Sequence, residues 1–240
     1  MKNYNYLGSW EFVIDFHTPT VDVPVLADKK LYIDNQLSFT IWLKTSKTEV
    51  DANYFFTYPG TADTNKNSQL YIIHKDKAFI LCFEANEKKV IKALYNNFIG
   101  KWTHITIVLT QDLLEIITAN CYINGEIVKN QLEPIEHFLK PEDSVFLTGF
   151  VLGNNVDTDR IHHSDEFANA EMSELYMYNR VLTDDEIMSA FHHKAPVKGR
   201  IISWEEFSTT LDGKTDVSIK PYPKELFWGN NRMISEATKA

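Results

Sequence analysis

The sequence predicts an all-β sandwich of two antiparallel sheets, and three observations support this. Short apolar or alternating runs recur along the chain between polar or turn-forming stretches, which is typical of half-buried strands. The dipeptide Asn124-Gly125 stands between two such runs, and only one segment, Thr183–Phe191, combines helix-start chemistry with an apolar side. The predicted strands are Trp10–Phe16, Leu37–Leu43, Tyr54–Tyr58, Leu70–His74, Ala78–Glu84, Trp102–Leu109, Ala119–Ile123, Val145–Leu147 and Leu175–Tyr178.

The turn at Asn124-Gly125 is the strongest hairpin signal in the chain, because a type I′ turn requires two positive φ values. It joins Cys121–Ile123 to Glu126–Val128. The preceding segment, Gln111–Asn120, brings further apolar residues, so the pattern allows a lengthened strand there without fixing its geometry. We expect two long polar loops, at residues 57–68 and 154–169, because stretches this polar do not belong in a core.

The segment that ends the last predicted strand leads directly into the helix. Met172, Leu175 and Met177 are apolar among polar neighbours, which indicates a partly buried strand without clean alternation. Thr183 and Glu186 have the spacing of a capping box. The helix that follows is completed by acidic first-turn residues, an apolar side and a basic end: Asp184, Asp185, Ile187, Met188, Phe191 and His192-His193-Lys194.

This strand, turn and helix, Ala170–Ile187, resembles the closing segment of laminin G-like, pentraxin and related concanavalin A-like domains. The resemblance spans roughly residues 7–229, and its pieces follow the order that the family has. It implies a concanavalin A-like jelly-roll sandwich with one short helix near the C-terminal part. The other pieces are Phe39–Thr45, Gly100–Val108, Cys121–Ile127, Val151–Asn154, Ile202–Phe207 and Ile219–Trp228.

We therefore expect one domain at residues 1–229 and a polar C-terminal tail at 230–240. An all-β sandwich of this length commonly forms a single domain, and 44% hydrophobic content is enough for a full core. The tail offers only Met233 and Ile234 as apolar anchors. Two such side chains cannot offset the entropy of ordering the tail by itself, so we expect it to order on a partner surface.

Charge and hydropathy exclude several kinds of partner. A net charge of −9 disfavours nucleic-acid binding, which draws on clusters of Lys and Arg. No apolar run approaches the roughly 18 residues that span a bilayer, and the first residues lack the apolar stretch of a secretory signal. We expect an intracellular protein without membrane insertion, with secretion as the alternative if the N-terminus was engineered.

Two cysteines, Cys82 and Cys121, are too few for a disulfide framework, and we expect free thiols. The resemblance bears on the same question. The pentraxin branch has a disulfide between two core strands, for which the matching positions here are Phe39 and Thr106. The loss of that bridge favours an intracellular relative.

The acidic residues do not predict an enzyme. Catalytic relatives of this fold, the retaining glucanases, carry the string Glu-x-Asp-x-x-Glu on one strand, and no such string is present. We expect Glu142-Asp143 in a loop, Asp184–Glu186 at a helix start and Glu205-Glu206 at a strand edge. The sequence therefore predicts neither catalytic residues nor a resident cofactor.

One acidic segment has the spacing of a calcium loop. Asn155, Asp157, Asp159 and Glu166 fall at first, third, fifth and twelfth positions. Arg160 stands where such a loop has Gly, and the segment that would supply further ligands in a pentraxin-like domain offers only Asn67 and Ser68. Calcium binding and a plain acidic surface loop both remain open at this point.

We expect the histidines to have structural roles and not to bind a metal ion. The pairs His162-His163 and His192-His193 are adjacent, and neighbouring residues of a strand point to opposite faces, which makes poor chelators. We expect His192-His193 to supply favourable charge at the helix C-terminus. His104 lies in a predicted strand without an activated Ser or Cys partner, and we expect it in the core or in a cross-strand pair.

The function predicted first is a non-catalytic interaction module, a protein-binding structural subunit of a larger intracellular assembly. The alternative is a carbohydrate-binding lectin, possibly calcium-assisted, and a glycoside hydrolase comes third. Fold alone does not choose among them. Exposed rings would favour the lectin, and the candidates are Tyr58, Tyr95 and Phe98.

Overall fold

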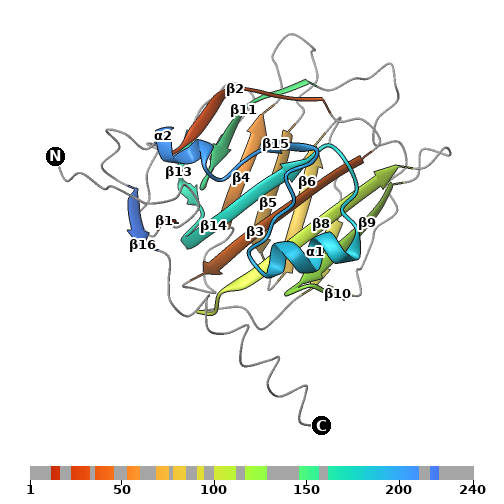
Figure 1. Ribbon diagram of the computed structural model, residues 1–240. Helices are drawn as coiled ribbons and strands as arrows, with labels where there is room; N and C mark the ends of the chain where they lie inside the picture. The colour runs from red at the N-terminus through yellow and green to blue at the C-terminus, as the bar shows by residue number, and fades with distance from the viewer. Residues whose placement is uncertain are drawn as a thin grey trace.

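The structure, a computed structural model, describes residues 12–16, 23–32, 36–45, 53–59, 69–75, 78–84, 91–94, 100–111, 117–128, 146–156, 162–210 and 217–221. These residues form a sandwich of two large antiparallel sheets with a separate hairpin and two helices (Figure 1). The all-β prediction is confirmed.

The larger sheet has eight strands. Seven follow the order β10-β9-β8-β3-β14-β1-β16, and β15 pairs with β14 beside this path. Their bounds are β1 Phe12–Asp15, β3 Gln36–Thr45, β8 Thr103–Gln111, β9 Ile117–Ile123, β10 Glu126–Val128, β14 Ala170–Tyr178, β15 Arg200–Ile202 and β16 Ser218–Pro221. In Figure 1 this sheet lies in front and carries helix α1, Asp184–Phe191, across its outer face.

The second sheet has six strands in the order β2-β11-β4-β5-β6-β7 and lies behind the first (Figure 1). Its strands are β2 Val25–Tyr32, β4 Asn53–Pro59, β5 Gln69–Lys75, β6 Ala78–Glu84, β7 Ile91–Leu94 and β11 Phe146–Leu152. A further two-stranded unit pairs β12, Asn154–Val156, with β13, His162–Phe167.

The core lies between the two large sheets and follows from strand alternation. In β3, Phe39 and Ile41 belong to the main core cluster, and Phe39 meets Phe56 of β4 edge-on at 5.5 Å between ring centroids. Alternate residues of β3 point to the other side, where Trp42 lies opposite His104 of β8. The large sheet is thus buried on its inner face by the second sheet and in part on its outer face by α1.

A bulge in β14 explains why its apolar residues do not alternate. Between Ser173 and Tyr176 the register against β3 shifts, so that β14 contributes one extra residue. Glu174 has a φ of 51° there, and Leu175 remains in the core. The extra residue lets the carboxylate of Glu174 leave the core side and reach the side that α1 covers.

The predicted hairpin at Asn124-Gly125 is confirmed. Both residues have positive φ, 53° and 83°, as a type I′ turn requires. The Asn124 side chain accepts a hydrogen bond from the His104 backbone N–H at 2.9 Å, and the Asn124 N–H donates back to the His104 carbonyl at 2.8 Å. The turn is therefore tied to the start of β8.

Several details of the prediction are wrong, and strands β2 and β7 were not predicted. Residues 57–59 belong to β4, with Thr57 and Tyr58 buried, and the expected loop at 154–169 holds the β12–β13 hairpin. A second helix, α2 Glu206–Thr210, follows β15 where a longer strand was expected, because the Glu206 carboxylate accepts a hydrogen bond from the Ser203 N–H. Phe39 lies opposite Ile107, and Thr106 opposite Thr40, so positions 39 and 106 do not face each other.

Glycine 153 offers a test of this packing. A Cβ there would overlap the ring of the fully buried Phe16, and the φ of +85° already disfavours side chains. We expect Gly153→Ala to lower the free energy of unfolding by about 2–4 kcal/mol in urea titrations, through strain and overpacking. Gly100→Ala is the matched control: its φ is +70° with open space around the Cβ, so about 1 kcal/mol is expected. Equal losses in both variants would contradict the packing argument.

Candidate functional site

Helix α1 and the turns at its two ends form the best-defined polar and aromatic region that the structure describes. The capping box at its start is present in full: Thr183 accepts from the Glu186 N–H, and the Glu186 carboxylate accepts from the Thr183 N–H at 3.0 Å. Asp184 and Asp185 lie in the first turn, where negative charge suits the helix dipole. Ile187, Ala190 and Phe191 are buried against the sheet.

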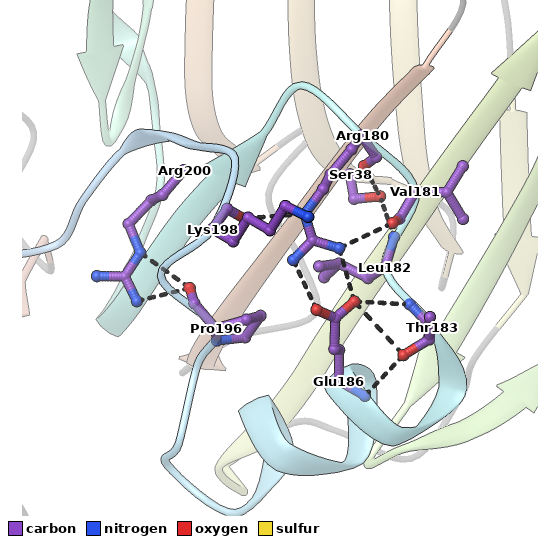
Figure 2. A network of polar contacts seen from close by, with 9 residues as sticks. All are labelled: Ser38, Arg180, Val181, Leu182, Thr183, Glu186, Pro196, Lys198 and Arg200. Carbon is purple, nitrogen blue, oxygen red and sulfur yellow. Dashed lines mark hydrogen bonds and ion pairs between the residues drawn. The ribbon is translucent and has the colours of Figure 1, made fainter.

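An arginine joins this helix start to the turn before it. Arg180 donates from both terminal nitrogens to the two carboxylate oxygens of Glu186, at 2.6 and 2.7 Å, as Figure 2 shows. This bidentate geometry is the strongest form of a side-chain ion pair. The hydrogen bond from Arg180, together with those from Thr183, lowers the pKa of Glu186 to about 2 despite partial desolvation. Arg180 and Glu186 are called the clasp below.

The clasp is anchored in the sheet and in the connection to β15. Ser38 of β3 donates to the Arg180 carbonyl at 2.7 Å and accepts from the Leu182 N–H at 3.2 Å. The Arg180 Nε donates to the Lys198 carbonyl at 2.8 Å. Figure 2 shows these contacts converging on one turn, so the position of α1 is fixed by β3 on one side and by the following connection on the other.

The opposite end of α1 is a Schellman motif with histidine where glycine is usual. The Lys194 N–H donates to the Ser189 carbonyl at 2.8 Å, and the His193 N–H to the Ala190 carbonyl at 3.0 Å. His193 has a φ of 61°, and its Nδ1 lies 2.7 Å from the Glu174 carboxylate in the β14 bulge. A backbone turn and a carboxylate therefore both hold this end.

Beneath this end lies a cluster of rings. Trp42 stacks on His193 at 5.0 Å and on Phe191 at 5.7 Å, and His104 lies 5.3 Å from Trp42 between centroids. His104 is 1% exposed, and its Nδ1 has no hydrogen-bond partner among the described residues. Burial, and secondarily the charges of His193 and His192, lower the pKa of His104 to about 3. His104 is therefore neutral at pH 7, as a core histidine should be.

The outer side of the same region exposes apolar side chains. Ile127 on the edge strand β10 is 62% exposed, and Met188 on α1 is 39% exposed. Tyr122 lies opposite Ile127 in the β9–β10 pair, and its hydroxyl donates to Asp184 at 3.2 Å. The thioether end of Met188 lies against Gly125, so the hairpin turn and α1 are in contact. Ile127, Tyr122 and Met188 are called the ridge below.

The structure describes only two of the four predicted calcium ligands. Asn155 lies in β12 opposite His163, and Glu166 lies in β13, while Asp157 and Asp159 fall outside the described residues. Within the described ranges, no three His, Cys, Asp or Glu side chains come together as a metal-ion cluster. Calcium binding stays a prediction. Met233 and Ile234 of the tail also lie outside the described residues.

Other predicted residues take structural positions. Tyr58 is 1% exposed in the core, and burial raises its pKa above the ordinary value, so it is not an exposed ring for a sugar. Tyr95 and Phe98 fall outside the described residues. Glu205 lies in the turn before α2 near Tyr176 and Arg200 rather than at a strand edge. Cys121 is a buried free thiol whose pKa is raised to about 12 by burial.

Sequence reasoning missed the Glu174–His193 contact and the ridge. One signal for Glu174 was available, because the spacing of Met172, Leu175 and Met177 departs from alternation by one residue, as a bulge produces. The exposure of Ile127 depends on β10 being an edge strand, which a sequence pattern does not state. No helix in the described part of the chain is long and apolar enough to cross a membrane.

Comparisons with known proteins agree with this architecture. A sequence-family model described as the concanavalin A-like lectin/glucanases superfamily, laminin G type, matches residues 20–188. Among solved structures, a heptameric SAP-like pentraxin from Limulus polyphemus has a TM-score of 0.58 at 15% identity, covering 90% of this chain and 94% of that chain. The concanavalin A-like and pentraxin-like fold is therefore shown.

Weaker likenesses extend to two further solved domains. The CBM40 of a Ruminococcus gnavus IT-sialidase has a TM-score of 0.42 at 14% identity, covering 65% of this chain and 83% of that one. Domain 4 of a Geobacillus stearothermophilus GH43 arabinanase has a TM-score of 0.42 at 18% identity, covering 68% of each chain. No curated protein matches the sequence.

The clasp makes a prediction for stability against pH. Because the folded pKa of Glu186 is lowered, its stabilisation is present above about pH 4.5 and is lost as the pH falls toward 2. We expect a double-mutant cycle of Arg180→Ala and Glu186→Ala to give a coupling of about 1–2 kcal/mol at pH 7, after allowance for partial exposure. The coupling, measured by urea unfolding, should shrink toward zero at pH 2. A coupling that is unchanged by acid would contradict the ion pair.

Proposed function

The chain belongs to the concanavalin A-like lectin/glucanases superfamily, and from this premise we propose that it is a non-catalytic interaction module. More specifically, we propose a protein-binding structural subunit of a larger intracellular assembly. The superfamily places binding surfaces on a rigid sandwich, so the choice of partner depends on the surface that this chain presents.

The observation that carries the proposal is the exposure of Ile127 on edge strand β10 and of Met188 on α1. Ile127 is 62% exposed, and covering an aliphatic side chain with another apolar surface lowers the free energy of the resulting complex. Ile127 and Met188 come from two different elements, which meet where Met188 lies against Gly125 and where the Tyr122 hydroxyl donates to Asp184. The ridge is therefore part of a preformed surface, and little ordering is needed on binding.

The chemistry of the ridge favours a protein partner over a sugar. Glycans are bound through stacked rings and several convergent polar groups, whereas the ridge offers an isoleucine and a thioether beside one tyrosine. Methionine adapts to irregular apolar surfaces. Among the described residues β10 pairs with β9 alone, so its other side could take an extended segment of a partner as an added strand, with Ile127 as its side-chain contact.

The alternative is a carbohydrate-binding lectin, with calcium at Asn155, Asp157, Asp159 and Glu166 as a proposed aid to binding. It would be supported by retention on a glycan column that EDTA abolishes and that Asp157→Ala removes. A glycoside hydrolase comes third. The described carboxylates closest to basic groups serve structural ion pairs: Glu186 with Arg180, Glu206 with Lys29, and Asp15 and Glu171 with Lys220.

Substitution at the ridge tests the proposal. We expect Ile127→Glu to reduce co-elution with the native partner at least tenfold, because it places a charge in an apolar contact. The melting temperature should change little, since Ile127 is mostly exposed. Val197→Glu is the matched control, as Val197 is 77% exposed on the connection after α1. The measurement is quantitative mass spectrometry of the complex isolated with each variant. Equal recovery with both variants, or elution by free sugar, would reject the ridge as the binding surface.

The tail at 230–240 is a second proposed contact, through Met233 and Ile234. We expect truncation after Gly229 to leave the melting temperature of the sandwich within about 2 °C, because the proposed domain ends there. Association with the assembly should weaken, measured by the same co-elution. If truncation unfolds the sandwich, or if association is unchanged, the tail is not a partner anchor.

A further inference from the structure

Two residues with a backbone conformation that favours glycine meet at the end of α1. Glu174 has a φ of 51° and His193 a φ of 61°. Their side chains are joined at 2.7 Å between Oε1 and Nδ1, and both are largely buried. Residues with a Cβ adopt this conformation at a cost, and they persist in it where surrounding contacts impose it. Here each supplies the contact that holds the other.

The contacts of the His193 ring explain why this position has a histidine, because the backbone conformation alone would favour glycine. Glycine would complete the Schellman motif without strain. The ring of His193 stacks on Trp42 at an interplanar angle of 20° and faces Glu174 at the same time. The ring therefore connects the end of α1 to β3 through Trp42 and to β14 through Glu174.

His104 lies under this contact, fully buried, and its Nδ1 has no hydrogen-bond partner among the described residues. Its ring is buried against Trp42 and Phe191, 5.3 and 5.9 Å away between ring centroids. Acid would have to place a proton on a ring that faces two other histidines. The buried position consequently lowers the pKa of His104 to about 3.

The charged and titratable groups around His104 come from several elements. From the turn that ends α1 they are His192 and His193, and from β14 Glu174 approaches through His193. On β3 the facing residue is the uncharged Trp42, and the titratable neighbour on that strand, Lys44, pairs with Glu171. On the hairpin side, Asn124, which is neutral, accepts from the His104 backbone N–H, and Tyr122 of β9 is bonded to Asp184. Among these described groups, only Glu174 offers a negative charge toward the histidines.

We propose that the end of α1, Phe191–His193, is an acid-sensitive latch on the outer face of the large sheet. In acid, His104 takes up a proton only when this end lifts from β3 and β8, so a falling pH favours the lifted state and uncovers Trp42. The clasp at the other end of α1 keeps its ion pair down to much lower pH, so the helix opens from its C-terminal end. This inference concerns α1 alone and does not depend on the proposed binding function.

The size of the effect follows from proton linkage. A histidine in water has a pKa near 6.5, whereas covered His104 has a pKa of about 3, so below pH 6.5 the open state binds more protons. The opening equilibrium then rises about tenfold at pH 5.5 and about a hundredfold at pH 4.5, relative to pH 7.5.

Hydrogen exchange on the full chain tests the latch. Exchange of residues 186–194 is compared with that of residues 105–109 in β8 at pH 7.5, 5.5 and 4.5, after correction for the intrinsic pH dependence of exchange. We expect α1 to lose protection by these factors while β8 keeps its protection. His104→Phe and His104→Gln should both remove most of the rise, and His163→Gln, in the β12–β13 hairpin, should retain it. Two replacements at position 104 are used so that a folding defect in one does not decide the result.

His193→Gly separates the latch from an ordinary helix cap. It keeps a backbone suited to positive φ and deletes the ring. If the ring holds α1, exchange of residues 186–194 increases even at pH 7.5, whereas a simple capping role predicts no loss of protection. The latch is overturned if α1 and β8 lose protection together, if α1 exchange is independent of pH, or if the rise survives in both His104 variants.

Discussion

Strand β3 is enclosed on both of its faces, and the arrangement of the rest of the molecule depends on this. Every residue from Leu37 to Leu43 is buried. Alternation sends Phe39 and Ile41 into the sandwich, where a second sheet covers them, and sends Ser38 and Trp42 outward. The outer face of β3 carries a tryptophan and hydroxyl groups that are buried under a cover, where Thr40 Oγ1 and Trp42 Nε1 have no hydrogen-bond partner among the described residues. Helix α1 and the turn before it supply that cover, with Ser38 hydrogen-bonded to both sides of the turn.

The two ends of α1 are held by different chemistry. At the start, a guanidinium that is charged at every accessible pH binds a carboxylate through two parallel hydrogen bonds. At the end, a histidine binds a carboxylate beside a buried neutral histidine. One attachment is insensitive to mild acid, and the other lies over His104, which burial keeps neutral. This asymmetry comes from two pairs of residues and requires no change in the sandwich itself.

Local patterns predicted the parts of the fold that local chemistry determines. Asn124-Gly125 and Thr183 with Glu186 each act within a few residues, and both were identified correctly. Helix α2 was missed although Ser203 and Glu206 repeat the same spacing, because its five residues are too short to show an apolar face. Glu174 and His193 are far apart in the sequence, and their contact exists only because a bulge redirects one and a Schellman turn presents the other. The ridge likewise depends on which strand ends the sheet.

The pairing of β1 with β16 has a mechanical consequence. These strands run antiparallel with Phe12 opposite Pro221, so the first and last described strands leave the sheet at one corner, where Lys220 binds Asp15 and Glu171. A pulling force applied to the chain before Phe12 and after Pro221 would act on this residue pair first and pull its two members apart. Hydrogen bonds of the β1–β16 pair then break one after another, as in a zipper, rather than all at once in shear. The sandwich would peel at this corner under a small force, while the strands behind it bear no load.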